Sequence, residues 1–236
     1  MKRQIFIHTI FVFFLAILTA CENNLIGPYE ETRQTYGLNG FDRLDMGSAF
    51  RITVTRGSAF AIEAKGNQRD VEDLDIYTRN GTLYAKYRNP LRSRRYSMNI
   101  DITMPELRGV DFSGASKSTV TGFTNVRELD IKLSGASKST VEVTASRINI
   151  DLSGASDLFL KGNGGVIRGE LSGASKVEAY DFPVEDADLD LSGASNAYVR
   201  VDKNLTVKAS GASDVRYRGA PVVRSQVSGA SKVRQD

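Results

Sequence analysis

Apolar and polar residues alternate along much of this 236-residue chain, which is the pattern of β-strands with one buried face. Phe50–Arg56 and Met98–Met104 each alternate over seven positions. Asn80-Gly81 stands between two short apolar runs and is typical of a tight β-hairpin turn. We therefore expect an all-β fold, in which only residues 68–74 could form a turn of helix.

A tetrapeptide, Ser-Gly-Ala-Ser, recurs seven times from residue 113, and successive copies begin 21, 19, 19, 20, 18 and 18 residues apart. Counting back from each copy, the first residue is apolar, the second is polar and the third is mostly apolar again. A half-buried strand therefore leads into every copy. Such a period leaves no room for a normal helix and predicts a stacked solenoid. The uneven period, without a hexapeptide repeat, favours a right-handed parallel β-helix.

We interpret the tetrapeptide as the corner of each turn. Glycine permits a bend that other residues resist. The alanine is expected to fill a narrow site in which leucine would clash, and the serines are expected to pass hydrogen bonds between turns. A motif repeated seven times is a poor candidate for one active site, so we assign it a structural role.

The N-terminus resembles a bacterial lipoprotein signal over residues 1–20. A basic head precedes an apolar stretch that closes with Leu18-Thr19-Ala20-Cys21, a lipobox pattern. We expect a lipid on Cys21, while a secretory signal with a chance cysteine and an uncleaved anchor are the alternatives. By resemblance to other lipoproteins, Glu22 favours the outer membrane, on either its periplasmic or its outer side. Beyond it we expect a tether (21–37), an N-terminal β head (38–104) and a β-helix of seven turns (105–236).

The composition excludes several kinds of catalytic and metal-binding site. Cys21 is the only cysteine, and His8, the only histidine, leaves with the signal. A mature chain of this kind has no thiolate nucleophile, no Ser-His-Asp triad and no typical zinc site, and we expect no cofactor. Loss of Lys2 and Arg3 leaves 29 basic and 28 acidic residues, so the charge does not predict nucleic-acid binding.

A basic segment, residues 86–96, interrupts the strand pattern and contains no acid. Its candidate ligand-binding residues are Lys86, Arg88, Arg92, Arg94 and Arg95. They could bind anionic glycans, lipopolysaccharide or phosphate groups through charge-assisted hydrogen bonds. The alternative is a solvated loop whose charge is balanced by the acids at positions 70, 72, 73 and 75.

An acidic row is expected on the solenoid, because Asp151, Glu170 and Asp190 occupy the same position in successive turns. Carboxylates in a row can hold Ca²⁺. Lys132 and Lys208 flank the row, which favours a solvated surface instead, and we predict no metal site.

The lipobox, the short β head and the repeated Ser-Gly-Ala-Ser turns resemble the putative auto-transporter adhesin, head GIN domain family, which is common among Bacteroidetes lipoproteins. The resemblance covers roughly residues 40–232. It implies a right-handed parallel β-helix in the cell envelope and brings no catalytic residues.

The leading hypothesis is a non-catalytic, lipid-anchored envelope protein, adhesin-like or scaffolding, whose partners are the membrane and an anionic glycan or envelope polymer. An alternative is a carbohydrate-active β-helix enzyme, a polysaccharide lyase or hydrolase, which would use carboxylates such as those of the acidic row. A third is a homo-oligomer that assembles through the exposed last turn, which ends at Arg234-Gln235-Asp236.

Overall fold

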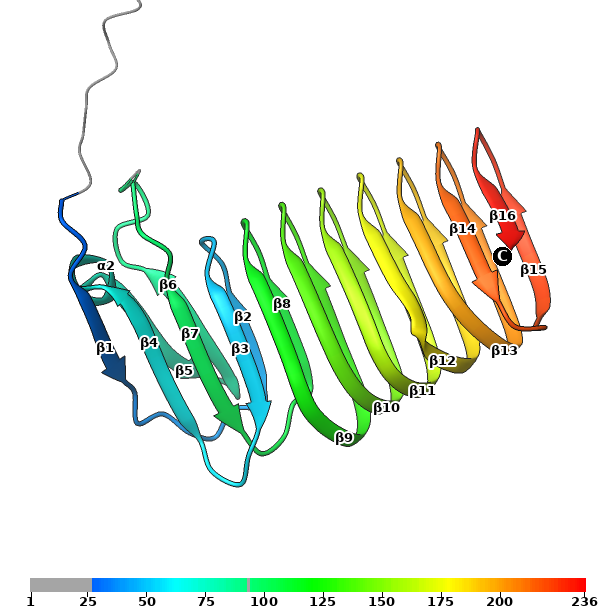
Figure 1. Ribbon diagram of the computed structural model, residues 1–236. Coiled ribbons are helices and arrows are strands. Elements are labelled where there is room, and N and C mark those ends of the chain that lie inside the picture. The colour runs from blue at the N-terminus through cyan, green and yellow to red at the C-terminus, as the bar shows by residue number, and fades with distance from the viewer. Residues whose placement is uncertain (1–26, 93) are drawn as a thin grey trace, which may run out of the picture.

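The alternating segments form strands, and the strands wind into one elongated coil (Figure 1). The computed structural model describes residues 27–92 and 94–236, so the expected signal and Cys21 lie outside the described residues. The strands of the repeats are β8 (Gly109–Phe112), β9 (Lys117–Leu133), β10 (Lys138–Leu152), β11 (Asp157–Leu171), β12 (Lys176–Leu191), β13 (Asn196–Ala209), β14 (Asp214–Arg218), β15 (Val222–Val227) and β16 (Lys232–Gln235).

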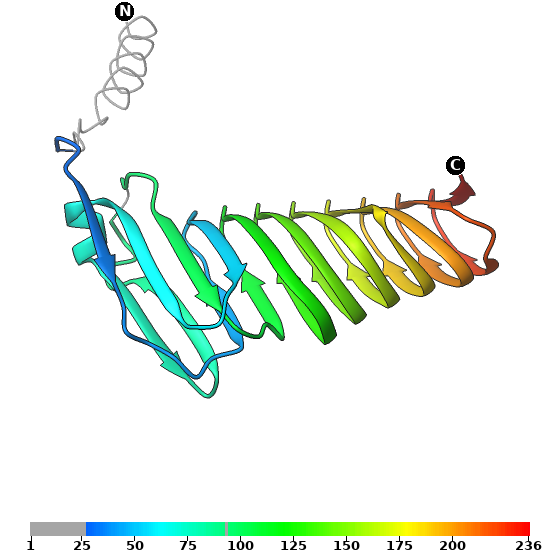
Figure 2. The ribbon, with the colours of Figure 1, turned by 60° about the horizontal axis from the view of Figure 1, so that its bottom comes forward.

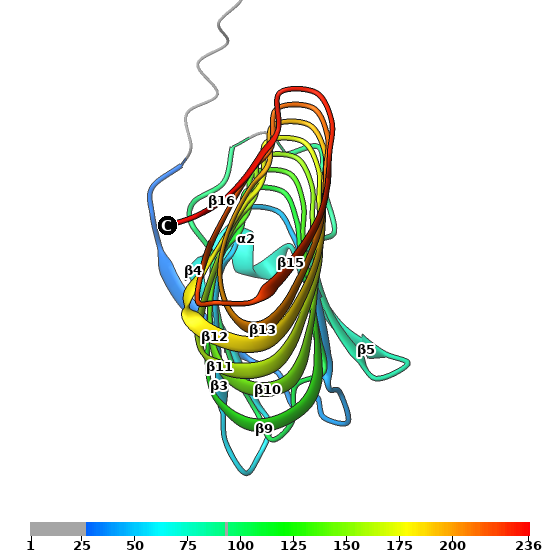
Figure 3. The same ribbon diagram turned by 90° about the vertical axis from the view of Figure 1, so that its right-hand side faces the viewer.

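Each long strand covers both faces of the coil. Its first half leads away from one Ser-Gly-Ala-Ser corner, and its second half returns along the other side to the next corner (Figure 1). We call the side that carries the first halves the descending face and the side that carries the second halves the ascending face. Thus β13 pairs with β14 on the descending face and with β15 on the ascending face. Figure 3, viewed from the C-terminal end, shows the chain rising through β15 and descending through β16 toward the viewer, which is a right-handed coil.

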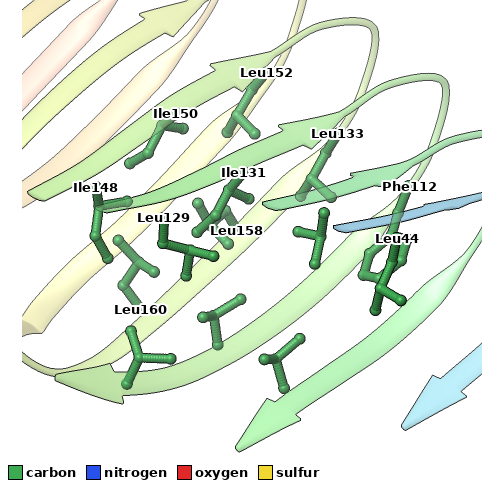
Figure 4. Close-up of a cluster of buried hydrophobic side chains, with 14 of the residues drawn as sticks. Leu44, Phe112, Leu129, Ile131, Leu133, Ile148, Ile150, Leu152, Leu158 and Leu160 are labelled. Carbon is green, nitrogen blue, oxygen red and sulfur yellow. The ribbon is translucent and has the colours of Figure 1, made fainter. Parts of the chain in front are cut away.

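Parallel pairing holds equivalent residues of successive turns in register. Leu133 pairs with Leu152, and Leu152 pairs with Leu171, so the apolar residue before each corner stacks on its copies. These leucines are at most 2% exposed and belong to a core that runs along the inside of the solenoid (Figure 4). The fold class predicted from the period is therefore confirmed: the protein is a right-handed parallel β-solenoid.

The glycine of every corner has a positive φ, between 69° and 77°. In six copies the last serine is buried and its hydroxyl donates to the carbonyl oxygen of the first serine of the same copy, at 2.7–3.0 Å. All six of these bonds therefore close a corner within one turn, whereas the hydroxyl oxygens of Ser175 and Ser195 also lie 3.4 Å apart between turns. The expectation that alanine fills a narrow site is wrong, because the alanines Ala115, Ala155 and Ala174 are exposed.

The head continues the stack beyond the repeats. Strands β2 (Arg43–Met46) and β3 (Arg51–Arg56) pair in parallel with β8 and β9, so they form one more coil. Its corner is made without the tetrapeptide: Ser48 and Ala49 have φ values of 65° and 63°. The Ser113 amide donates to the Met46 carbonyl at 3.0 Å, which continues the hydrogen-bond ladder. One 16-stranded sheet thus crosses the expected boundary at residue 104.

The outermost parallel coil consists of β6 (Thr82–Tyr87) and β7 (Asn99–Met104), which pair with β2 and β3. Residues 88–92 and 94–98 stand where the other coils have a corner. Antiparallel strands close this end: β1 (Glu31–Thr35) and β4 (Ala61–Asn67) beside β7, and β5 (Leu74–Arg79) beside β6. The helical turn and the hairpin are confirmed as α2 (Gln68–Glu72) and β5–β6. Among the described residues, no helix is long and apolar enough to cross a membrane.

Candidate functional site

The basic segment lies at the outermost coil, next to α2. Lys86 Nζ is 3.9 Å from Asp75 Oδ2 on the neighbouring β5. Arg88 Nη1 donates to the Glu72 carbonyl at 3.3 Å.

Arg92 and Arg94 follow in the loop. Arg92 Nη1 donates to the Arg69 carbonyl at 3.5 Å and is 4.0 Å from Asp73 Oδ2. The Arg94 carbonyl accepts a hydrogen bond from the Arg69 guanidinium at 3.2 Å. The structure therefore brings the basic residues close to the acids that could balance them.

Arg95 differs from the other four because its side chain is only 12% exposed. Its guanidinium bonds to Asp73, lies 3.6 Å from Asp70 Oδ1 and stacks 3.6 Å over the centre of the Tyr87 ring. Asp70 is fully buried and also accepts the Tyr96 amide at 2.9 Å. Burial raises the pKa of the Tyr87 hydroxyl to about 12, so it stays protonated. Arg95 thus fastens the segment to the fold.

A shallow trough of about 450 Å³ crosses β9 to β13 on the ascending face. The predicted acidic row lies in it: Asp151 pairs with Glu170, and Glu170 pairs with Asp190 on the next strand. Lys132 and Lys208 flank the row as expected. The other charged residues that line the trough are Asp130, Arg168 and Asp188.

Asp130 is the best-connected carboxylate of the trough. It accepts hydrogen bonds from Arg43 Nη2 at 2.9 Å and from Asn149 Nδ2 at 2.8 Å. Burial alone would raise the pKa of Asp130, but these two bonds outweigh it and hold the pKa below its usual value. The repeat alignment places Asn149 beside Asp130, whereas no local signal links Asp130 to Arg43, 87 residues earlier.

Beyond Lys132 the same column continues with two more acids, Asp111 and Asp45, which pair across β8 and β2. Burial raises the pKa of Asp45, and the neighbouring Asp111 adds to the effect. Burial also raises the pKa of Asp111. The charge of Lys132 lowers this pKa, and the charge of Asp151 raises it. The alignment of the repeats places Asp111 in this column, whereas Asp45 was not predicted, because Gly47-Ser48-Ala49 does not resemble the repeated corner.

The trough has the chemistry of a polar contact surface. Carboxylates, ammonium groups, a guanidinium and an amide line it, so an extended polar ligand would find both donors and acceptors. Within residues 27–92 and 94–236, no three His, Cys, Asp or Glu side chains are grouped so that they could hold a metal ion.

Solved structures show the same fold. A putative adhesin from Bacteroides fragilis superposes with a TM-score of 0.84 at 18% identity, covering 89% of this chain and 98% of that one. A putative adhesin from Parabacteroides distasonis gives 0.74 at 15% identity, with 89% and 98% covered. A putative lipid binding protein from the same species gives 0.72 at 14% identity, with 87% and 96% covered.

No curated protein sequence matches the chain. The family model described as "Putative auto-transporter adhesin, head GIN domain" matches residues 40–221, which include the β2–β3 coil, the trough and most of the repeated corners. With well over half of its length matched, the chain belongs to the putative auto-transporter adhesin, head GIN domain family.

Proposed function

We propose that this protein is a non-catalytic, lipid-anchored protein of the cell envelope that presents a rigid β-solenoid as an adhesin-like or scaffolding surface. The observation that carries the proposal is the single 16-stranded sheet, which holds outward side chains in fixed columns over the length of the molecule. A rigid array loses little conformational entropy when it binds, so many weak contacts can together give a useful affinity. Membership of an adhesin family supports the same function.

The anchor is inferred from the lipobox at Leu18–Cys21, and the outer membrane from Glu22. In cells that express the full chain, we expect the wild type in the outer-membrane fraction and a Cys21→Ser variant out of it. Protease added to intact cells then distinguishes the outer surface from the periplasmic side. Equal fractionation of the two proteins would contradict a lipid anchor on Cys21.

The basic segment is our proposed contact for an anionic glycan or envelope polymer. Arg88 and Arg92 are suitable for a test, because their side chains bond to backbone carbonyls rather than to the buried Asp70. A glycan array probed with the full chain and with an Arg88→Gln/Arg92→Gln variant should show weaker binding of acidic glycans by the variant. Arg95 is left intact in this test, since it fastens the segment. Equal binding by both proteins would remove the segment from consideration.

A carbohydrate-active enzyme is the second candidate, and the trough is the observation that favours it. Asp151 and Glu170 lie on adjacent strands, about 5 Å apart by the usual strand spacing, a separation that glycosidase carboxylates can have. Incubation of the full chain with envelope polysaccharides tests this candidate. Release of new sugar ends that is abolished by Glu170→Gln would favour the enzyme and contradict the non-catalytic proposal.

A further inference from the structure

The last coils of the solenoid carry a basic and aromatic surface on the descending face. It is formed by the outward side chains of Asn196–Arg200, β14 and residues 232–236, with Tyr180 reaching over from β12. We call it the distal patch, because it lies at the end of the described solenoid opposite β1 (Figure 2). Its cations are Arg200, Arg216, Arg218, Lys232 and Arg234.

Positive charge is concentrated in the distal patch. Two acids, Asp214 and Asp236, accompany the five cations, so the patch has a formal charge of +3. Residues 21–236 as a whole have a charge of +1, from 29 basic and 28 acidic residues. The patch is therefore more positive than residues 21–236 as a whole, and it attracts anions.

Arginines stand opposite each other on adjacent strands of the patch. Arg216 pairs with Arg234, and this pair shares Asp214, whose Oδ2 lies 3.0 Å and 2.8 Å from the two guanidinium groups. Arg200 pairs with Arg218, and among the described residues neither makes an ion pair. Like charges directly opposite one another destabilise a sheet, so an anion bound between Arg200 and Arg218 would relieve a repulsion.

Tyr180 and Tyr198 lie against two of the arginines, Arg218 and Arg216. Arg218 lies 4.0 Å over the Tyr180 ring, and the Tyr180 hydroxyl donates to Asp236 Oδ2 at 2.6 Å. Tyr198 packs edge-to-face against Tyr180, with ring centres 5.8 Å apart. Arginines fixed by aromatic rings lose little freedom when they bind, and both residue types are common at the centres of binding surfaces.

We propose that the distal patch binds a carboxylated polysaccharide. Guanidinium groups match carboxylates in a two-bond geometry, so Arg200 and Arg218 would bind the sugar carboxylates while the tyrosines contact the sugar rings. Arg216 and Arg234 form a second opposed pair beside Arg200 and Arg218, so the patch suits a chain with several spaced anions better than a single small ion. Nucleic acid is disfavoured, because such binding depends on many phosphate contacts and the patch has only five cations. The proposal does not depend on the lipid anchor or on the basic segment.

The test measures binding of the full-length protein, in detergent, to immobilised polygalacturonate and to its methyl ester, which lacks the charge. We expect binding to polygalacturonate only. An Arg200→Gln/Arg218→Gln variant should bind about tenfold more weakly or worse, because two charge-assisted contacts are lost. These two side chains are exposed and make no ion pair among the described residues. The variant loses the contact of Arg218 with the Tyr180 ring but also the repulsion between the two cations, so its melting temperature should stay within about 2 °C of the wild type.

An Arg51→Gln/Arg224→Gln variant is the matched control, because it removes the same charge from exposed arginines that lie outside the distal patch and outside the trough. We expect it to bind within about twofold of the wild type, as surface charges off the contact add little. Equal loss in both variants, or no binding by the wild type, would overturn the proposal. So would tighter binding of duplex DNA that depends on Arg200 and Arg218. Loss confined to Arg88→Gln/Arg92→Gln would assign the ligand to the basic segment instead.

Discussion

At six of the seven repeated corners, the glycine faces the carbonyl oxygen of the glycine one turn earlier. A Cβ added at Gly173 would lie 2.5 Å from the Gly154 oxygen, and the backbone at Gly173 has a φ of +73°. Both the close approach and the positive φ exclude a side chain at this position. The neighbouring alanines point to solvent, so the corner is specified by its glycine and by the buried last serine.

Gly173→Ala should therefore destabilise the protein by about 2 kcal/mol or more, because it combines backbone strain with a clash against backbone. The midpoint of thermal unfolding, followed by circular dichroism, should fall by roughly 4–8 °C for a chain of this size. Ala174→Leu is the control one residue away, and we expect it to change stability by no more than about 0.5 kcal/mol, since Ala174 is exposed. A larger effect at Ala174 than at Gly173 would contradict this view of the corner.

Arg95 and Arg92 are close in sequence but differ in burial, with 12% and 34% of the side chain exposed. Arg95→Gln leaves the buried Asp70 without one of its cations and should cost about 3 kcal/mol. Arg92→Gln removes a 4.0 Å contact near the surface and should cost less than about 0.5 kcal/mol. Urea unfolding of the two variants measures the difference, and equal stabilities would show that Arg95 does not fasten the segment.

The last strand, β16, is attached to β14 by the carboxylate of Asp214 as well as by the backbone ladder. Burial acts to raise the pKa of Asp214, but hydrogen bonds from Arg234 and Arg216 outweigh it and lower the pKa below its usual value of 3.8. A lowered pKa means that the charged form stabilises the fold. This contribution is complete above the unfolded-state pKa and is lost as the pH falls through the lower pKa of the folded protein.

Asp214→Asn should therefore cost about 1 kcal/mol near neutral pH, when both arginines lose their shared anion. The difference between wild type and variant should shrink once the pH drops below about 3.8 and should vanish below the folded-state pKa. Unfolding midpoints of both proteins across the acid range provide the measurement. A difference that stays constant from neutral to strongly acid pH would rule out the ionised Asp214 as the cause.

At the scale of the whole molecule, each coil contacts mainly the coils before and after it, as the pairing of β9 through β13 shows. The stability of such a stack is roughly the sum of its turns and of the interfaces between neighbours. An interior coil is therefore replaceable, provided that the register of the remaining strands is kept.

Deletion of residues 176–195, one complete coil from corner to corner, should leave a folded protein with a lower unfolding midpoint. The deletion would let β13 pair with β11 in the register that β12 now occupies. Deletion of residues 176–185 removes half a coil and should prevent folding, because the second half of β12 would then follow a corner directly. Trypsin resistance and circular dichroism compare the two; equal resistance would contradict the nearest-neighbour arrangement.

Much of the solenoid could be predicted from the columns around Ser113 and its copies, since period-two alternation identifies the buried face of each strand. The acidic row of Asp151, Glu170 and Asp190 was predictable for the same reason. The coil of β2 and β3 was not, because its corner uses Ser48 and Ala49 at positive φ without the repeated motif. The contacts of Asp130 with Arg43 and of Tyr180 with Asp236 were not predictable either, since the partners lie 87 and 56 residues away.

The sequence by itself determined the period, the strands and the parallel register, because stacking of identical turns makes the linear order of residues equal to their order in space. Only the tertiary structure decided where that order fails. The strands β6 and β7 lie outside β2 and β3 although they follow them in the chain. The tertiary structure also decided which arginines have acidic partners. Arg95 is held by buried acids, whereas Arg200 and Arg218 face each other on adjacent strands. These differences arise from contacts between distant segments, which no local pattern records.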